Sequence, residues 1–216
     1  MVSFDIVTIF PEVVDAYKSV GILSIAQKKN LVEINSHNLR KWTTDKHKTV
    51  DGTPAGGGPG MILKVEPIYK AIQDLKRENT IVAITTPKGE RLVQPKLREF
   101  SNVKDLHMII LCGRYEGFDQ RIYDNLVDYE FSIGDYVLAG GELPALVLVD
   151  GITRLIPGVL GNSDSLNEES FDNNQLEYPQ YTQPENFNGW KIPSVLLSGD
   201  HKKVEEYRNS LKKKVE

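Results

Sequence analysis

Two short runs of the sequence are apolar at every position rather than at alternate positions. Residues 81–84 read Ile-Val-Ala-Ile, and residues 108–111 read Met-Ile-Ile-Leu. A strand that is apolar throughout is buried on both faces, as happens when helices cover both sides of a parallel sheet. The two runs therefore predict an α/β domain built around a parallel sheet.

Strand and helix patterns alternate through residue 160. After the strand Phe4–Phe10, Pro11 opens a helix, because proline is favoured in the first helical turn. Further strands are predicted at Val32–Ser36, Ile81–Thr85, Leu106–Leu111 and Tyr129–Ser132, and helices at Val65–Arg77, Pro95–Phe100, Phe118–Leu126 and Leu143–Arg154. We assign residues 1–160 to this α/β domain.

The composition changes after Arg154. Residues 161–190 contain six carboxylates and no lysine or arginine, and Asn, Gln and Ser are frequent, which is typical of a flexible linker. Beyond them, His201–Val215 has apolar residues at helical spacing. We therefore predict a linker at 161–175 and a small helical domain at 176–216.

Composition excludes several classes of protein. Apolar residues make up 40% of the chain, which excludes disorder as its main state. The net charge of −4 excludes nucleic-acid binding by bulk attraction, so such a partner needs a local basic patch. The single Cys112 excludes a disulfide framework and makes the cytoplasm the default location. The longest apolar run, Leu143–Val149, is too short to span a membrane.

Four glycine-rich segments follow predicted strands: Gly56–Met61, Thr86–Gly89, Cys112–Gly117 and Ile133–Pro144. In a parallel sheet, ligands bind at the carboxyl ends of the strands. Glycine lets backbone amides and carbonyls approach a ligand such as the edge of an adenine. Taken singly, each segment is more often a structural turn. No phosphate-loop or dinucleotide-binding signature is present, which disfavours a nucleoside triphosphate site.

The first glycine segment ends a long loop that begins near Leu39. This loop contains Arg40, Lys41, Trp42, Lys46, His47 and Lys48. Basic residues beside an aromatic ring suit phosphates and an unpaired base. The alternative interpretation is a solvated surface loop with a glycine turn.

Four strings of the sequence closely resemble the bacterial tRNA (guanine-N1)-methyltransferases of the SPOUT superfamily. They are GGGPGM (56–61), CGRYEGFDQR (112–121), SIGDYVLAGGELPAL (132–146) and RLIPGVLGN (154–162). The resemblance implies a homodimer with active sites at the subunit interface. It also implies a deep trefoil knot in the C-terminal part of the α/β domain, with S-adenosyl-L-methionine held in the knot loops. General topology rules treat such threaded chains as nearly absent.

By this resemblance, the loops after three strands hold or border the cofactor. The predicted residues are Thr85, Thr86, Pro87, Gly113, Tyr115, Glu116, Ile133, Gly134, Asp135, Tyr136, Val137, Leu138, Gly140, Gly141 and Pro144. The last three are expected to shape their loop.

The resemblance implies methyl transfer to N1 of the guanosine 3′-adjacent to the anticodon, with the tRNA anticodon stem-loop as partner. N1 carries a proton, so the reaction needs a base, and the charge that develops on O6 needs a donor. Arg154 stands at the matching arginine. Glu169 occupies the position where the family usually has aspartate, and Glu168 and Asp172 are alternatives for the base. The alternative to an enzyme is an RNA-binding SPOUT protein with lost or altered catalysis.

A second departure from the family pattern lies at Gln180 and Gln183, where the family commonly has His and Arg. Two phosphate contacts are therefore missing. The tRNA contacts of this domain are expected to be weaker, or redistributed toward Lys202, Lys203 and Arg208.

The four histidines are too scattered along the chain for a metal-ligand pattern. We predict no protein-bound metal. Members of the family can depend on Mg²⁺, which these residues neither support nor oppose.

Overall fold

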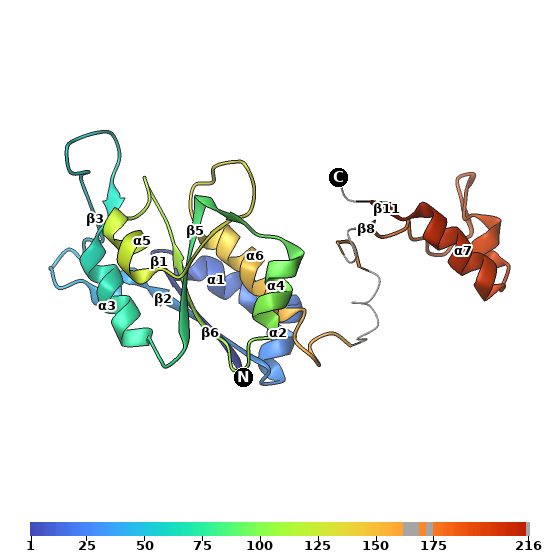
Figure 1. Ribbon diagram of the computed structural model, residues 1–216, viewed down its shortest axis with the longest axis horizontal. Helices are drawn as coiled ribbons and strands as arrows, with labels where there is room; N and C mark the ends of the chain where they lie inside the picture. Colours follow the sequence, from blue (N-terminus) through green and yellow to red (C-terminus); the bar gives the residue numbers. More distant parts are fainter. Residues whose placement is uncertain (162–168, 172–174, 215–216) are drawn as a thin grey trace. The chain divides into compact units, whose positions relative to one another are not determined.

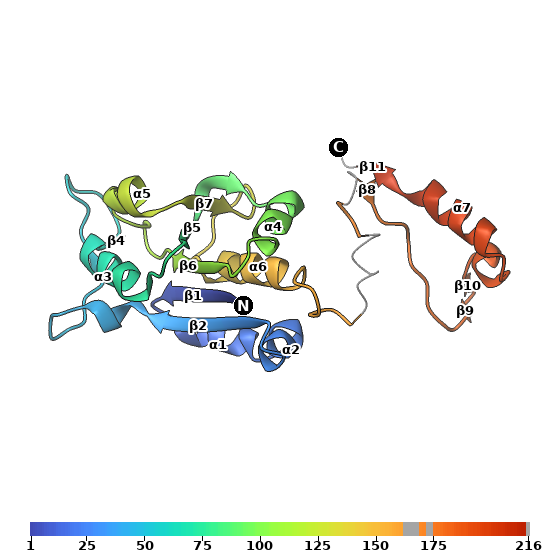
Figure 2. The ribbon, with the colours of Figure 1, turned by 60° about the horizontal axis from the view of Figure 1, so that its bottom comes forward.

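The computed structural model describes residues 1–161, 169–171 and 175–214. Its centre is a five-stranded parallel sheet in the order β2-β1-β6-β5-β7. The strands are β1 (Val2–Thr8), β2 (Val32–Asn38), β5 (Thr80–Arg91), β6 (His107–Cys112) and β7 (Tyr129–Ser132); Figure 1 labels the first four, and Figure 2 labels β7 as well. The prediction of an α/β domain around a parallel sheet is confirmed.

Helices cover the sheet on both faces. On one face lie α3 (Val65–Leu75) and α5 (Gln120–Leu126), which are adjacent in Figure 2. Their buried Ile68 and Ile122 join Val7, Ile109 and other residues of the sheet in one apolar cluster. The opposite face is covered by α1 (Pro11–Lys18), α2 (Gly21–Lys28), α4 (Gln94–Ser101) and α6 (Glu142–Thr153).

Burial explains the continuous apolar runs. Successive side chains of a strand point to opposite faces, and Val82, Ala83 and Ile84 of β5 are each at most 2% exposed. In β6, Met108 to Leu111 are completely buried. Both strands lie inside the sheet, so neither face of them meets water.

Two predicted element boundaries need correction at the start of the chain and at α5. The first strand ends at Thr8 rather than Phe10, and two helices, α1 and α2, follow it instead of one. The helix predicted from Phe118 begins at Gln120, because Asp119 caps it by accepting the N–H of Arg121 at 3.0 Å.

The prediction that Thr86–Gly89 forms a turn after its strand is wrong. β5 continues to Arg91, and its pairing with β7 shifts register between Thr85 and Glu90, so the segment is a bulge within the strand. A Cβ on Gly89 would lie 2.5 Å from the backbone carbon of Glu130. Glycine is required here for the close approach of two strands.

Short elements complete the first part of the chain. A 3₁₀ turn, η1 (Leu39–Trp42), follows β2, and the two-residue strands β3 (Asp51–Gly52) and β4 (Ile62–Leu63) pair antiparallel around the glycine segment Gly56–Met61. The chain divides into two compact units, Met1–Gly161 and Asn162–Glu216.

The second unit is built around α7 (His201–Leu211). Its other elements are η3 (Ser194–Leu197) and the short strands β8 (Gln175–Leu176), β9 (Asn186–Phe187), β10 (Trp190–Lys191) and β11 (Lys213–Lys214). The helix predicted to reach Val215 ends at Leu211, because Lys213 and Lys214 turn to pair with β8. Val215 itself lies outside the described residues.

Candidate functional site

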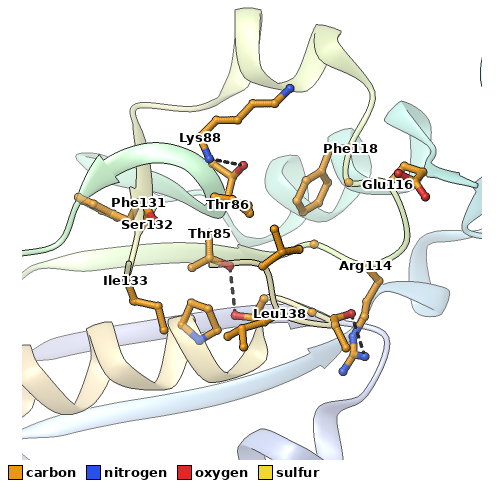
Figure 3. Close-up of a pocket in the computed structure, with 18 of the residues that line it drawn as sticks. Thr85, Thr86, Lys88, Arg114, Glu116, Phe118, Phe131, Ser132, Ile133 and Leu138 are labelled. Carbon is orange, nitrogen blue, oxygen red and sulfur yellow. Dashed lines mark hydrogen bonds between the residues drawn. The ribbon is translucent and has the colours of Figure 1, made fainter. Parts of the chain in front are cut away.

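A cavity of about 390 Å³ opens at the carboxyl ends of β5, β6 and β7. Its walls come from the bulge of β5, the loop after β6, the loop after β7 and the first turn of α6 (Figure 3). Thr85 of β5 and Leu138 of the loop after β7 both appear in this close-up, although they are far apart in the sequence. The position agrees with the rule that parallel sheets bind ligands at this edge.

The structure brings nearly all the predicted cofactor residues together around this cavity. They are Thr85, Thr86, Pro87, Gly113, Tyr115, Glu116, Ile133, Gly134, Tyr136, Val137, Leu138, Gly140, Gly141 and Pro144. Asp135 does not line the cavity. Its side chain is 92% exposed and pairs at 3.8 Å with Arg91, so it faces solvent although its loop neighbours face the cavity.

Three chain segments meet at Gly141. Its N–H donates to the carbonyl of Gly113 at 2.8 Å, and its own carbonyl accepts the hydroxyl of Thr85 at 3.1 Å. A Cβ at this position would lie 2.4 Å from Oγ1 of Thr85 and 2.7 Å from the nitrogen of Gly113. Only glycine permits this contact, which joins the middle of β5 and the end of β6 to the start of α6.

The glycine segment before β4 contacts the rim of the cavity. The N–H of Glu116 donates to the carbonyl of Met61 at 3.0 Å, which fixes the loop after β6 against this segment. Gly60 has a positive φ of 80°, and a Cβ there would lie 2.6 Å from Cγ of Glu116. Two of the four glycine segments are therefore joined through Glu116.

Sequence reasoning missed several residues that line the cavity: Lys88, Arg114, Gly117, Phe118, Gln120, Tyr123, Phe131, Ser132 and Ala139. Most of them lie inside the strings that carried the resemblance, so the strings themselves were the available signal. Tyr123 and Phe131 had no such signal, because α5 and β7 reach the cavity only through the folding of the chain. Burial raises the pKa of Tyr123, so its hydroxyl stays protonated at neutral pH.

Cys112 is the last residue of β6, beside the cavity, but its thiol is not placed to act as a nucleophile. Its side chain is 3% exposed, and burial raises the pKa of the thiol well above its usual range. The thiolate is the reactive form of cysteine. Cys112 therefore packs as a small apolar residue.

Of the predicted catalytic residues, Arg154 belongs to the same unit as the cavity but does not line it. Arg154 is the half-buried residue that ends α6, whereas the cavity contacts the first turn of the same helix. Twelve residues of α-helix are about 18 Å long. Glu169 is half-buried and belongs to the second unit, and Glu168 and Asp172 lie outside the described residues.

Comparison with known proteins identifies the family. A family model described as tRNA (Guanine-1)-methyltransferase TrmD matches residues 2–215. The chain belongs to this family. The predicted family is thereby confirmed, and the strings that line the cavity are part of the matched region.

Curated relatives in the family are similar over almost the whole chain, and each of those compared here is named tRNA (guanine-N(1)-)-methyltransferase. One from Dictyoglomus turgidum is 52% identical over 96% of this chain and 84% of its own length. One from Ruminiclostridium cellulolyticum is 49% identical over 95% of this chain and 88% of its own length. One from Clostridioides difficile is 47% identical over 95% and 90%.

Within the described ranges, none of the helices is long and apolar enough to cross a membrane. The same residues include no group of three or more His, Cys, Asp and Glu side chains placed to bind a metal ion.

Proposed function

We propose that this protein transfers a methyl group from S-adenosyl-L-methionine to N1 of the guanosine 3′-adjacent to the tRNA anticodon. The observation that carries the proposal is the cavity at the carboxyl edge of the sheet, lined by the strings that the family shares. The relatives are named for methyl transfer to guanine N1 of tRNA. A tRNA substrate places the reaction in the cytoplasm.

The cavity has the properties that S-adenosyl-L-methionine requires. Its volume lies in the range of small-molecule sites. Ile133, Leu138 and Pro144 offer apolar contacts for an adenine ring, and the backbone around Gly113 and Gly141 is open to close approach because neither residue has a side chain. When bound, the cofactor supplies an electrophilic methyl group on a sulfonium sulfur.

The acceptor side of the reaction is assigned to Glu169 and Arg154. Glu169 takes the proton from N1 of guanine, and the guanidinium of Arg154 stabilises the negative charge that develops on O6. Glutamate provides a carboxylate, as does the aspartate that the family usually has at this position. Its side chain is longer by one methylene group. Glu168 and Asp172 are the alternative bases.

The site requires a second copy of the chain. Leu143 and Val147, one turn apart on α6, are 58% and 47% exposed, although α6 is otherwise an apolar helix packed on the sheet. Such a face is typical of a subunit interface. A two-fold contact with antiparallel α6 helices brings Arg154 of the second copy to the cavity at the other end of α6. We therefore assign each active site to a dimer interface.

The fold around the cavity is assigned to the SPOUT type with a deep trefoil knot. The resemblance of the loop strings supports this assignment. Basic residues of the loop after β2 and of the second unit are assigned to the tRNA anticodon stem-loop. Arg40, Lys46, Lys48, Lys202 and Lys203 are the most direct candidates for phosphate contacts.

The test is incubation of the purified protein with methyl-labelled cofactor and a tRNA transcript that has two guanosines across the anticodon boundary. Label at N1 of the second guanosine is expected, and a transcript with adenosine there is the control. An absence of label would refute the enzyme. Cofactor and tRNA binding without transfer would instead select the RNA-binding alternative, and EDTA in the same assay tests the need for Mg²⁺.

A further inference from the structure

Arg114 lies on the wall of the cavity, and each nitrogen of its guanidinium contacts another group of the protein. Its Nε donates to Glu142 at 3.1 Å for Oε1 and 3.0 Å for Oε2, and one of its terminal nitrogens lies 2.9 Å from Oε2. Its other terminal nitrogen donates to the carbonyl of Ala139 at 3.3 Å (Figure 3). The guanidinium therefore holds both a carboxylate and the backbone of the loop after β7.

Glu142 is a buried acid at the first residue of α6. It is 1% exposed, and its Oε1 also accepts the hydroxyl of Thr8 at 2.6 Å. A buried carboxylate is unfavourable unless it is paired and hydrogen-bonded. Arg114 pairs with this carboxylate, and both Arg114 and Thr8 donate hydrogen bonds to it.

These contacts join three segments that are distant in sequence. They are the end of β1 through Thr8, the loop after β6 through Arg114, and the stretch where the loop after β7 enters α6, through Ala139 and Glu142. A Cβ on Gly140 would lie 2.2 Å from Nε of Arg114 and 2.5 Å from Oε2 of Glu142. The loop reaches its position beneath the guanidinium only because residue 140 has no side chain.

One face of the guanidinium lies against an aromatic ring. The Cζ atom of Arg114 lies 4.6 Å from the centroid of the Phe10 ring, in a cation–π contact. The side chain is 24% exposed. Arg114 is therefore committed to contacts within the protein and is poorly placed to move toward a substrate.

We propose that Arg114 is a positioning residue that holds the loop Ile133–Gly141 in its cofactor-binding shape through the bidentate pair with Glu142. This inference rests on the proposed function, because the loop is assigned to S-adenosyl-L-methionine. Arg114 then sets the affinity for the cofactor and leaves the methyl-transfer step nearly unchanged. Lysine cannot replace it, because an ammonium group lacks the planar fork that binds a carboxylate and a carbonyl together.

The test compares Arg114→Lys with the double variant Arg114→Gln, Glu142→Gln, which leaves no buried charge unpaired. Arg91→Lys is the matched control, because Arg91 also pairs with the loop after β7, through Asp135, but at 67% exposure. Calorimetry with S-adenosyl-L-methionine is expected to show a Kd raised ~10-fold or more in both Arg114 variants, because the binding shape of the loop becomes a minor population. The control should stay within about twofold of wild type.

Two further measurements separate positioning from general destabilisation. At saturating cofactor, kcat of Arg114→Lys should stay within about threefold of wild type while KM for the cofactor rises. Amide hydrogen exchange should accelerate in residues 133–141 and not in β1 or β6. Hydrogen exchange unchanged in this loop would argue against the inference.

The outcomes distinguish this inference from the proposed function. If wild type does not bind S-adenosyl-L-methionine, the proposed function fails. If wild type binds it and both folded Arg114 variants bind equally well, the positioning role is wrong. A fall in kcat with an unchanged KM would contradict the positioning role as well, because it would place Arg114 at the transferred group.

Discussion

The proposed reaction depends on individual side chains, and Glu169 has the central role. Its carboxylate is the proposed base for N1 of guanine, so Glu169→Gln should lower kcat ~10²-fold or more while the affinity for S-adenosyl-L-methionine stays nearly unchanged. Glu169→Asp is the control, because it restores the residue that the family usually has and should remain active. Single-turnover kinetics measure the effect. Normal turnover in Glu169→Gln would move the role to Glu168 or Asp172.

A second residue-scale prediction concerns Asp5, which is 2% exposed in the middle of β1. Burial alone would raise its pKa, but hydrogen bonds from His37 and His107, each at 2.7 Å, outweigh burial and hold the pKa at about 2, below the usual 3.8. A depressed pKa in the folded state stabilises the fold above the unfolded pKa, and this stabilisation is lost as the pH falls.

Asp5 should therefore contribute about 2 kcal/mol to the free energy of unfolding above pH 3.8. The contribution should disappear as the pH falls to about 2. Urea unfolding of wild type and Asp5→Asn over this range measures it. A gap between the two proteins that stays constant with pH would contradict the assignment.

At the scale of elements, the cavity depends on close contacts between loops that belong to different strands. Gly141 is the point where the middle of β5 and the end of β6 meet the start of α6. In Gly141→Ala, the new Cβ would force Thr85 and Gly113 away, so cofactor affinity should fall ~10-fold or more and Tm should drop. Calorimetry and thermal unfolding measure the two effects.

Gly161→Ala is the matched control for this prediction, because a Cβ there meets nothing within 4 Å. It should leave both the cofactor affinity and Tm unchanged. If Gly141→Ala binds the cofactor as tightly as the control does, the loop contact does not shape the site.

At the scale of the whole molecule, the proposed dimer predicts that each cavity uses Arg154 of the other copy. A heterodimer of one Gly141→Ala chain and one Arg154→Ala chain has one intact site if each cavity uses the arginine of the other copy. With the cofactor well below the wild-type KM, it should recover about half of wild-type activity, while each mutant homodimer keeps about a tenth of that activity or less. Differently tagged chains, co-expressed and purified through both tags, provide the sample. An inactive heterodimer would show that each chain uses its own Arg154.

The sequence alone determined the class of the fold and most of the candidate site. Continuous apolar runs imply strands buried on both faces, and such strands require a parallel sheet between helices. Most of the cavity residues could be predicted because they lie in short strings whose glycines are needed for close backbone contact. Gly113 and Gly141 are examples. The apolar runs and the glycine strings are both patterns of neighbouring residues, so the sequence shows them directly.

Only the tertiary structure decided how distant segments combine. It extended β5 through Gly89 because β7 lies beside it, and it turned Asp135 to solvent while its neighbours line the cavity. It also paired Arg114 with Glu142, residues 28 positions apart, and placed Arg154 at the far end of α6. The physical reason is that these contacts depend on which strands become neighbours and on which end of a helix meets the cavity, and no local pattern of residues encodes either.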